Sequence, residues 1–167
     1  MHLKLRSGMK VADLGAGTGH YARAAAAVVG RDGRVYAIDV QENVLKHASL
    51  NMPPHGHGVV SYVWGDIEQL GGTKLQSGAL DAVILANALF QIADREGLVA
   101  EVKRILKPGF GKLLVVDWAG SYGGVGPAPE HVVTEHAAEE LFIGAGFHKE
   151  QAFRGGPHHY GLVFLAP

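Results

Sequence analysis

The sequence predicts a single α/β domain in which helices cover a doubly wound, mostly parallel sheet. Short apolar runs alternate with longer segments of helical character along the 167 residues. A glycine-rich turn follows the first apolar run directly, and acids follow the second and third runs at Asp39 and Asp66. Strands that alternate with helices indicate a parallel sheet, and open sheets of this kind bind ligands outside the carboxyl ends of their strands.

Composition and charge fit one ordinary domain covering residues 1–167, with 47% hydrophobic and 19% charged residues. A chain of this length buries about 70% of its unfolded surface, which is enough for a core without covalent staples. The formal net charge of -1 lacks the basic excess typical of avid nucleic-acid binding. The absence of cysteine excludes disulfides, thiolate metal sites and cysteine nucleophiles.

The sequence carries no recognisable membrane span or secretory leader. Its first residues lack an apolar core long enough for a signal peptide. The longest apolar stretch, residues 80–90, is interrupted by Asp81 and Asn87 and is too short to cross a bilayer. Together with the absence of cysteine, these features favour a cytoplasmic location.

The first strand is expected at residues 9–14, followed by a tight turn and a helix that Thr18 caps and that runs to about Val29. Such a turn brings backbone N–H groups and a helix dipole close to a ligand, and glycine is needed where a Cβ would block the approach. The three glycines are Gly15, Gly17 and Gly19, so their spacing differs from the dinucleotide pattern G-x-G-x-x-G.

The second strand, residues 34–38, ends at Asp39, which lies 20 residues after Gly19. An acid at this position accepts hydrogen bonds from ribose hydroxyls in nucleotide-binding α/β folds. The alternative is that Asp39 only caps the helix expected at residues 42–50.

The third strand is expected at residues 59–64 and leads into Gly65, Asp66 and Ile67. Asp66 also suits the cap of a following helix. The preceding loop holds His55 and His57, but no third ligand is evident nearby, so the sequence predicts a solvated loop and no metal site.

The fourth strand, residues 79–87, is almost continuously apolar, as a central parallel strand should be. A helix capped by Asp94 (residues 95–106) and a fifth strand (residues 112–118) follow. The loop at residues 119–129 is rich in Gly and Pro. It is either a lid with Trp118, Tyr122 and His131 as contacts or a mere connector.

The last predicted elements are a helix that Thr134 caps and that runs to about Ile143, and two strands at residues 147–153 and 160–165. The turn between these strands, Gly155-Gly156-Pro157, favours an antiparallel pair.

The run from Asp13 to Gly19, D-x-G-x-G-x-G, resembles motif I of the class I S-adenosylmethionine-dependent methyltransferases. The segment Leu-Lys-Pro-Gly-Phe-Gly-Lys-Leu-Leu at residues 106–114 is similar to a recurrent segment of the same family, in its type 11 or ubiquinone/menaquinone-like branch. The resemblance covers essentially the whole chain. It implies a Rossmann-like seven-stranded sheet with order 3-2-1-4-5-7-6, an antiparallel seventh strand, and helices between the first five strands.

The resemblance also implies S-adenosyl-L-methionine as cofactor, S-adenosyl-L-homocysteine as product, and a small-molecule methyl acceptor. The glycine loop would hold the methionyl end, Asp39 the ribose, and Asp66 and the Ile67 N–H the adenine. The full expected cofactor set is Asp13, Gly15, Ala16, Gly17, Gly19, Asp39, Val40, Gly65, Asp66, Ile67 and Asn87.

The implied reaction is an in-line displacement, for which the protein mainly holds donor and acceptor in line and excludes water. A base is needed only when the acceptor carries a proton. The expected catalytic residues are His20, Tyr21 and Asn87, and Gln91 is expected to line the pocket.

Two alternatives remain beside a small-molecule methyltransferase. The segment Asn87-x-x-Phe90 is superficially like the [N/D]-P-P-[Y/F] motif of enzymes that methylate nucleobase amines in RNA or DNA. It lacks both prolines, and a place in the core is the favoured interpretation of Phe90. The other alternative is a non-catalytic S-adenosylmethionine-binding module. Its support is that only eight residues precede Met9, where the family commonly carries helices that cover the substrate. The acceptor pocket would then be open, completed by the partner subunit of a homodimer, or no longer functional.

Overall fold

The computed structural model describes residues 2–167, which form one seven-stranded sheet with the order β3-β2-β1-β4-β5-β7-β6. The predicted strand order is therefore confirmed. Strand β7 runs antiparallel to both β5 and β6, and the other neighbouring strands are parallel. The strands are β1 (Lys10–Leu14), β2 (Arg34–Asp39), β3 (Val60–Trp64), β4 (Ala82–Ala86), β5 (Lys112–Trp118), β6 (His148–Arg154) and β7 (His159–Leu165).

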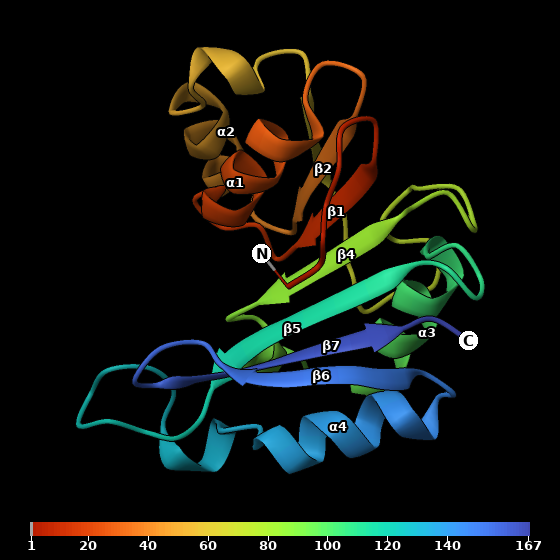
Figure 1. Cartoon of the computed structure of the whole chain (residues 1–167). Helices are drawn as coiled ribbons and strands as arrows, with labels where there is room; N and C mark the ends of the chain where they lie inside the picture. The colour runs from red at the N-terminus through yellow and green to blue at the C-terminus, as the bar shows by residue number, and fades with distance from the viewer. Residues whose placement is uncertain (1) are drawn as a thin grey trace.

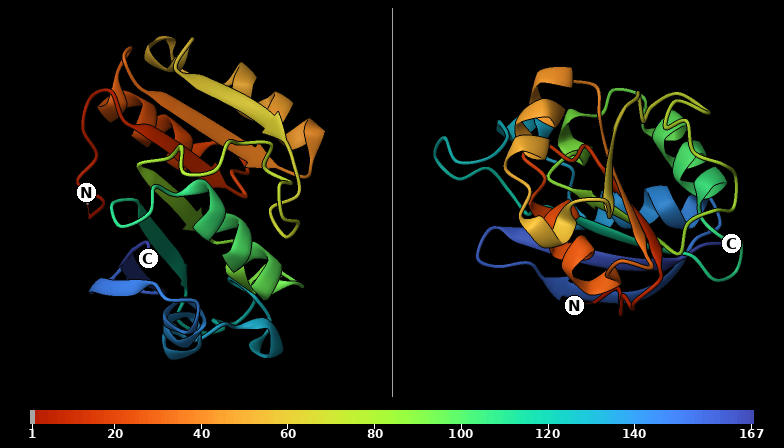
Figure 2. Two further views of the ribbon diagram at one scale, coloured as in Figure 1. Left: turned by 90° about the vertical axis from the view of Figure 1, so that its right-hand side faces the viewer. Right: turned by 90° about the horizontal axis from the view of Figure 1, so that it is seen from above.

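Four α-helices cover the sheet, with α1 and α2 on one face and α3 and α4 on the other (Figures 1 and 2). They are α1 (His20–Val29), α2 (Glu42–Leu50), α3 (Arg95–Ile105) and α4 (Glu135–Gly144), and the 3₁₀ turns are η1 (Pro54–Gly56), η2 (Leu89–Gln91) and η3 (Pro129–His131). Because the helices change face where the chain moves from β3 back to β4, the carboxyl ends of β1 and β4 face an open crevice.

The core has one layer on each face of the sheet. Val11, Ile84 and Val116 pack toward α1, whereas Leu14, Leu85 and Val115 pack toward α3 and α4. All five residues of β4 are buried, which explains its continuous apolar sequence. Because both layers pack on one sheet, the edge formed by the carboxyl ends of β1 and β4 is supported from both faces.

Side-chain caps start two of the helices as predicted. Asp94 Oδ1 accepts from Gly97 N at 2.9 Å, and Thr134 Oγ1 accepts from Ala137 N at 3.2 Å. The predicted cap at Thr18 is wrong: α1 is capped by Gly19, whose φ of 77° is left-handed, without a side-chain hydrogen bond. The tight glycine turn continues through Gly19, so Thr18 lies within the turn.

The expected helix between β3 and β4 is also absent. Residues 65–81 form successive turns instead. Gly71 has a φ of 83°, and the backbone N–H groups of Gly71 and Thr73 donate to the side chain of Glu101 in α3 rather than to a helical backbone. Asp66 consequently caps a turn and not a helix, with Oδ1 accepting from Glu68 N at 2.9 Å.

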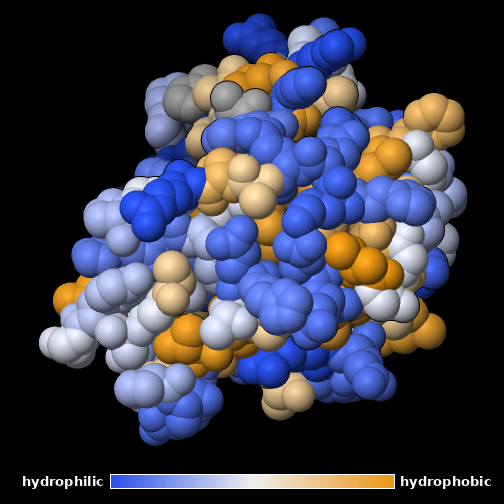
Figure 3. All heavy atoms as spheres, turned by 60° about the horizontal axis from the view of Figure 1, so that its bottom comes forward, coloured by the Kyte–Doolittle hydropathy of each residue, from blue (hydrophilic) through white to orange (hydrophobic). Residues whose placement is uncertain are grey.

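The surface seen from the side of α4 is largely hydrophilic, with separate small hydrophobic patches (Figure 3). None of the helices between residues 2 and 167 is long and apolar enough to cross a membrane. Over the same described residues, no group of three or more His, Asp or Glu side chains is arranged to hold a metal ion. His57 instead donates from Nε2 to the carbonyl oxygen of Met52 at 2.9 Å.

Candidate active site

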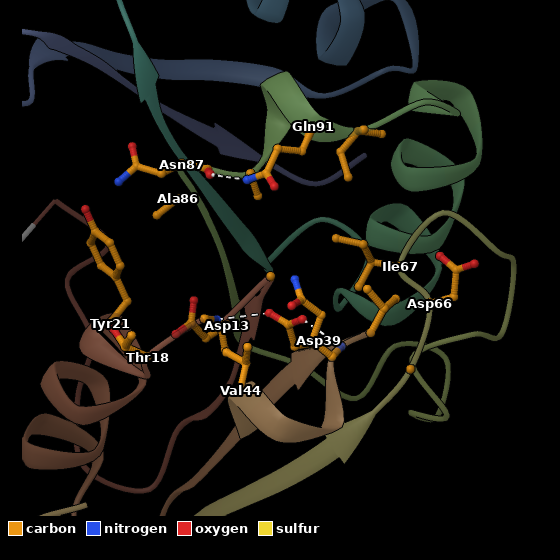
Figure 4. Close-up of a pocket in the computed structure, with 18 of the residues that line it drawn as sticks. Asp13, Thr18, Tyr21, Asp39, Val44, Asp66, Ile67, Ala86, Asn87 and Gln91 are labelled. Carbon is orange, nitrogen blue, oxygen red and sulfur yellow. Dashed lines mark hydrogen bonds between the residues drawn. The ribbon is translucent and has the colours of Figure 1, made fainter. Parts of the chain in front are cut away.

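A cavity of about 560 Å³ opens at the carboxyl ends of β1, β2 and β4. Figure 4 shows that Tyr21 and Asn87 lie at one end of the cavity, Asp66 and Ile67 at the other, and Asp39 between them. The cavity is lined by Asp13, Gly15, Ala16, Gly17, Thr18, His20, Tyr21, Asp39, Val40, Gln41, Val44, Gly65, Asp66, Ile67, Glu68, Ala86, Asn87, Ala88, Gln91 and Ile92.

The glycine turn forms one wall of this cavity and is tied to the end of β2. Ala16 N donates to the carbonyl oxygen of Ile38 at 3.0 Å, and Gly17 N donates to Asp39 Oδ2 at 3.0 Å. Gly15 has a φ of 67°, and a Cβ there would lie 3.0 Å from the Cβ of Ala88. Glycine is therefore required at this position by both backbone conformation and space.

Asp39 holds two backbone groups and keeps acceptor capacity for a ligand. Oδ2 accepts from Gly17 N and Oδ1 from Gln41 N, each at 3.0 Å. An ionised carboxylate offers about four lone-pair sites, so about two remain beside the cavity. That arrangement suits a ligand with neighbouring hydroxyl groups.

Asp13 is the most perturbed group in the cavity. It is 2% exposed, and its Oδ2 has no hydrogen-bond partner. The pKa of Asp13 is raised to about 7, chiefly by burial; a backbone hydrogen bond from Ala22 works against this rise, and the nearby charge of Asp39 adds to it. A buried carboxyl oxygen without a donor is costly, so a ligand that brought a cationic N–H group would relieve it.

The turn after β4 forms the opposite wall. Asn87 has a φ of 53°, a left-handed conformation that asparagine tolerates better than most residues. Its N–H donates to the carbonyl oxygen of Val116 at 2.8 Å, and its own carbonyl oxygen accepts from Gln91 Nε2 at 3.2 Å. Leu89 N donates to buried Asp117 Oδ2 at 2.8 Å. The strained turn is thus fixed to β5, which aims Asn87 at the cavity.

His20 and Tyr21 start α1 beside this turn, with their rings edge to face at a centroid separation of 5.3 Å. His20 is exposed, and Tyr21 is half-buried. Burial, and then the charge of Asp13, raise the pKa of Tyr21, so its hydroxyl remains a donor near neutral pH.

The carboxyl groups that line the cavity are not balanced by lysine or arginine side chains. Four carboxyl side chains line the cavity, those of Asp13, Asp39, Asp66 and Glu68, and neither lysine nor arginine is among the lining residues. Such a site favours ligands that carry positive charge and disfavours ligands with a net negative charge, such as phosphates.

The sequence predicted this lining well. Every expected cofactor or catalytic residue lines the cavity except Gly19, which serves as the cap of α1, and Gln91 lines it as expected. Trp118, Tyr122 and His131 do not line it; the rings of Trp118 and His159, and those of Tyr122 and His158, instead contact each other at tilted angles of 40° and 45°. The lining residues that the sequence reasoning missed are Thr18, Gln41, Val44, Glu68, Ala86, Ala88 and Ile92. Gln41 and Val44 are three residues apart at the start of α2, a spacing that puts them on one side of the helix directly after Asp39.

Comparison with known proteins agrees with this geometry. A family model described as a methyltransferase domain matches residues 12–115, a segment that runs from β1 into β5. The chain belongs to the class I S-adenosylmethionine-dependent methyltransferases.

Members of this family that resemble the chain include two named ubiquinone/menaquinone biosynthesis C-methyltransferase UbiE. The protein from Shewanella sp. (strain ANA-3) is 34% identical over 115 residues, which cover 68% of this chain and 44% of the relative. The protein from Psychromonas ingrahamii is 33% identical over 116 residues, covering 69% and 45%. The chain therefore matches less than half the length of these relatives.

A solved structure gives the methyltransferase likeness over almost the whole chain. The S-adenosylmethionine-dependent methyltransferase from Aquifex aeolicus superposes with a TM-score of 0.89 at 27% identity, covering 99% of this chain and 86% of that one. The fold of the described residues is thus the methyltransferase fold throughout.

The lining residues fit the cofactor of this methyltransferase family, S-adenosylmethionine. The unpartnered Oδ2 of Asp13 suits a cationic ammonium, and the spare acceptor capacity of Asp39 suits a ribose diol. The glycine turn leaves room for close approach of the ligand to the backbone, since the nearest atom to a Cβ at Gly17 would be the carbonyl oxygen of Gly15, at 4.0 Å.

Proposed function

We propose that the protein transfers the methyl group of S-adenosylmethionine to a small neutral molecule bound between Tyr21 and Asn87. The observation that carries this proposal is the charge of the cavity, with four carboxyl groups and no lysine or arginine in its lining. This lining favours a cationic cofactor, while Tyr21 and Asn87 offer uncharged polar groups to an acceptor.

Each expected cofactor residue has a proposed role. The glycine turn and Asp13 receive the methionyl end, Asp39 accepts from the ribose hydroxyls, and Asp66 with the Ile67 N–H holds the adenine. Glu68 and Val40 border the same end of the cavity. The proposal also treats residues 1–167 as one domain, because both core layers share a single sheet.

When bound, S-adenosylmethionine supplies a methyl group activated by its sulfonium. The protein's own task is to orient the acceptor in line with that methyl group and to keep water out. Tyr21 and Asn87 are placed to donate hydrogen bonds to the acceptor from opposite walls. His20, exposed at the mouth, accepts a proton where the acceptor carries one.

The nucleic-acid alternative has less support. Phe90 packs against the core cluster and is not among the lining residues, so it is not placed to stack on a base. The acidic cavity would also repel a phosphate backbone. A homodimer and a cytoplasmic location remain predictions.

The first test is a calorimetric titration with S-adenosylmethionine, S-adenosylhomocysteine and NAD, using wild type, Asp39→Asn and the exposed control Asp32→Asn. The proposal expects both adenosyl ligands to bind wild type and the control, with binding weakened in Asp39→Asn. Preference for NAD, or no binding of adenosyl ligands, would overturn it.

The second test is methyl transfer from labelled cofactor to a panel of neutral, anionic and RNA acceptors. The name of the UbiE relatives refers to C-methylation in ubiquinone and menaquinone biosynthesis, so neutral aromatic quinols come first. Turnover with neutral acceptors supports the proposal. Cofactor binding with no turnover on any acceptor would favour the non-catalytic module, and RNA methylation the nucleobase alternative.

A further inference from the structure

The segment between β3 and β4 is held by a buried carboxylate from another element. Glu101 in α3 has no exposed surface. Its carboxylate accepts from the backbone N–H of Gly71 at 2.7 Å, from the backbone N–H of Thr73 at 3.2 Å, and from the Thr73 hydroxyl. A buried charge is retained only where donors surround it, and here the donors belong to a segment about 30 positions earlier in the chain.

Arg104 completes this arrangement. Its Nε and Nη2 each donate to Glu101 at 2.7 Å, and its Nη1 reaches Ser77 Oγ at 3.1 Å. Although burial raises the pKa of Glu101, hydrogen bonds from Arg104, Thr73 and Gly71 lower it to about 2. The Glu101 carboxylate is therefore ionised near neutral pH, where both of its oxygens accept hydrogen bonds.

Gly72 in this fixed segment packs against the backbone at the cofactor end of the cavity. Glu101 holds the residues on both sides of Gly72. A Cβ at Gly72 would overlap the carbonyl oxygen of Asp66, and a Cβ at Gly65 would overlap the carbonyl oxygen of Gly72. Gly65 and Asp66 both line the cavity, so their backbone rests directly on the residue that Glu101 fixes.

A second tie joins the same segment to the start of α3. Glu68 Oε2 accepts from Asp94 N, and a Cβ at Gly97 would overlap the carbonyl oxygen of Glu68. Gly97 and Glu101 are four residues apart and so lie on one face of α3. The segment from Gly65 to Thr73 is thus held against one face of α3 at two points, Gly97 and Glu101.

We propose that Glu101 is a positioning residue for the adenosyl end of the cofactor, acting through Thr73 and Gly72 on the backbone of Gly65 and Asp66. Glu101 is not among the residues that line the cavity, so it would act through its neighbours. The proposal rests on the function proposed above, since it assigns that end of the cavity to the adenosyl group.

The variants are chosen so that folding and positioning separate. Removing one partner of a buried ion pair is strongly destabilising, so Glu101→Ala is unsuitable. Glu101→Gln keeps the shape and one acceptor oxygen. Thr73→Ala keeps the Glu101–Arg104 pair but removes a hydroxyl that donates to Glu101 and accepts from Arg104 Nη2 at 3.3 Å and Leu75 N at 3.4 Å. The control is Glu139→Gln, which breaks the ion pair of Glu139 with Lys149 between α4 and β6, a pair 2.6 Å long.

The measurement is the Kd of S-adenosylhomocysteine by calorimetry, on variants whose circular dichroism and melting curve confirm folding. Glu101→Gln is expected to weaken binding about tenfold, and Thr73→Ala by about threefold, as expected for partial loss of hydrogen bonds to a charged group. Glu139→Gln is expected to bind like wild type. If Glu101→Gln does not fold, Thr73→Ala decides.

A double-mutant cycle provides a readout that general destabilisation would not move. Because Glu101 acts on Asp66, the effects of Glu101→Gln and Asp66→Ala on Kd should fall short of additive, whereas Glu101→Gln and Asp39→Asn should add. Folded variants with the wild-type Kd, or additive effects with Asp66→Ala, would overturn the inference. A wild type that binds no adenosyl ligand would instead overturn the proposed function itself.

Discussion

Gly17 and Asp39 lie 22 positions apart in the sequence and are joined by a hydrogen bond of 3.0 Å from the Gly17 N–H to Asp39 Oδ2. The bond links the glycine turn after β1 to the end of β2, so a single contact holds two parts of the expected cofactor site together. One carboxylate thereby shapes the turn and keeps acceptor capacity for the ligand.

Asp39→Asn should therefore lose two functions at once. An amide offers one acceptor oxygen in place of two, so either Gly17 N or Gln41 N loses its partner, and the ribose contact weakens. We expect Kd for S-adenosylhomocysteine to rise by roughly tenfold or more, the loss typical of a hydrogen bond to a charged group. The matched control is Asp32→Asn, an exposed aspartate in the turn before β2. Equal binding by both variants would contradict the role of Asp39.

Asp13 should make stability fall as the pH rises. Its pKa in the folded protein is raised from 3.8 to about 7. Between these two values the folded state binds more protons than the unfolded state, so the free energy of unfolding decreases with rising pH across that window, by at most about 4 kcal/mol. In Asp13→Asn, urea unfolding between pH 5 and pH 8 should show less of this decrease. A pH dependence identical to that of wild type would contradict the assignment.

Cofactor binding should have the opposite dependence on pH. A cationic group placed near Asp13 favours its ionised form, so Kd for S-adenosylhomocysteine should fall as pH rises from 6 to 8. Calorimetry in buffers of different ionisation enthalpy should detect proton release on binding. Asp13→Asn is the control and should release none from this site.

Gly15→Ala tests why the turn needs glycine. Alanine at this position would have to adopt a left-handed φ of 67°, and its Cβ would lie 3.0 Å from the Cβ of Ala88. The variant should therefore lose roughly 1–3 kcal/mol of stability. Gly8→Ala is a matched control, because Gly8 has a φ of 83° but open space. Combining Gly15→Ala with Ala88→Gly removes the contact between the two Cβ atoms, so the double variant should recover the part of the lost stability that this contact causes. If Gly8→Ala and Gly15→Ala cost the same, the contact with Ala88 is unimportant.

Asp117→Asn should affect the acceptor end and spare the cofactor end. Asp117 is 1% exposed and accepts from Leu89 N and Trp118 N, each at 2.8 Å. Asparagine leaves one of these donors unpaired, which should cost about 1–3 kcal/mol and loosen the turn that carries Asn87. We expect a lower kcat in methyl-transfer assays with an unchanged Kd for S-adenosylhomocysteine. A raised Kd with unchanged kcat would show that the turn serves the cofactor instead.

Comparison of Asn87→Gly with Asn87→Ala separates backbone from side chain at that turn. Both variants lose the amide, but only alanine is strained at a φ of 53°, so Asn87→Ala should be less stable than Asn87→Gly by about 1 kcal/mol. Thermal unfolding measures this difference. Similar losses of methyl transfer in both variants would assign the functional effect to the amide side chain.

The sequence by itself determined the strand and helix pattern, because that pattern depends on neighbours within a few residues. Periodicity placed α2 at Glu42–Leu50 and β5 at Lys112–Trp118, and the glycine turn with Asp39 marked the cavity. The order of the strands came from the resemblance of the motifs to a known family.

Tertiary structure alone decided what depends on partners far along the chain. Glu101 fixes the position of the turns between β3 and β4 through hydrogen bonds that span about 30 positions. The unpartnered oxygen of Asp13 arises from burial, which no local pattern reveals. Likewise, Asp117 fixes the turn after β4 by accepting from the Leu89 N–H, which lies 28 positions away in the chain. Neighbouring residues set the backbone preference of each segment. Which polar groups lose contact with water, and which distant donors and acceptors meet, depends on the assembled fold.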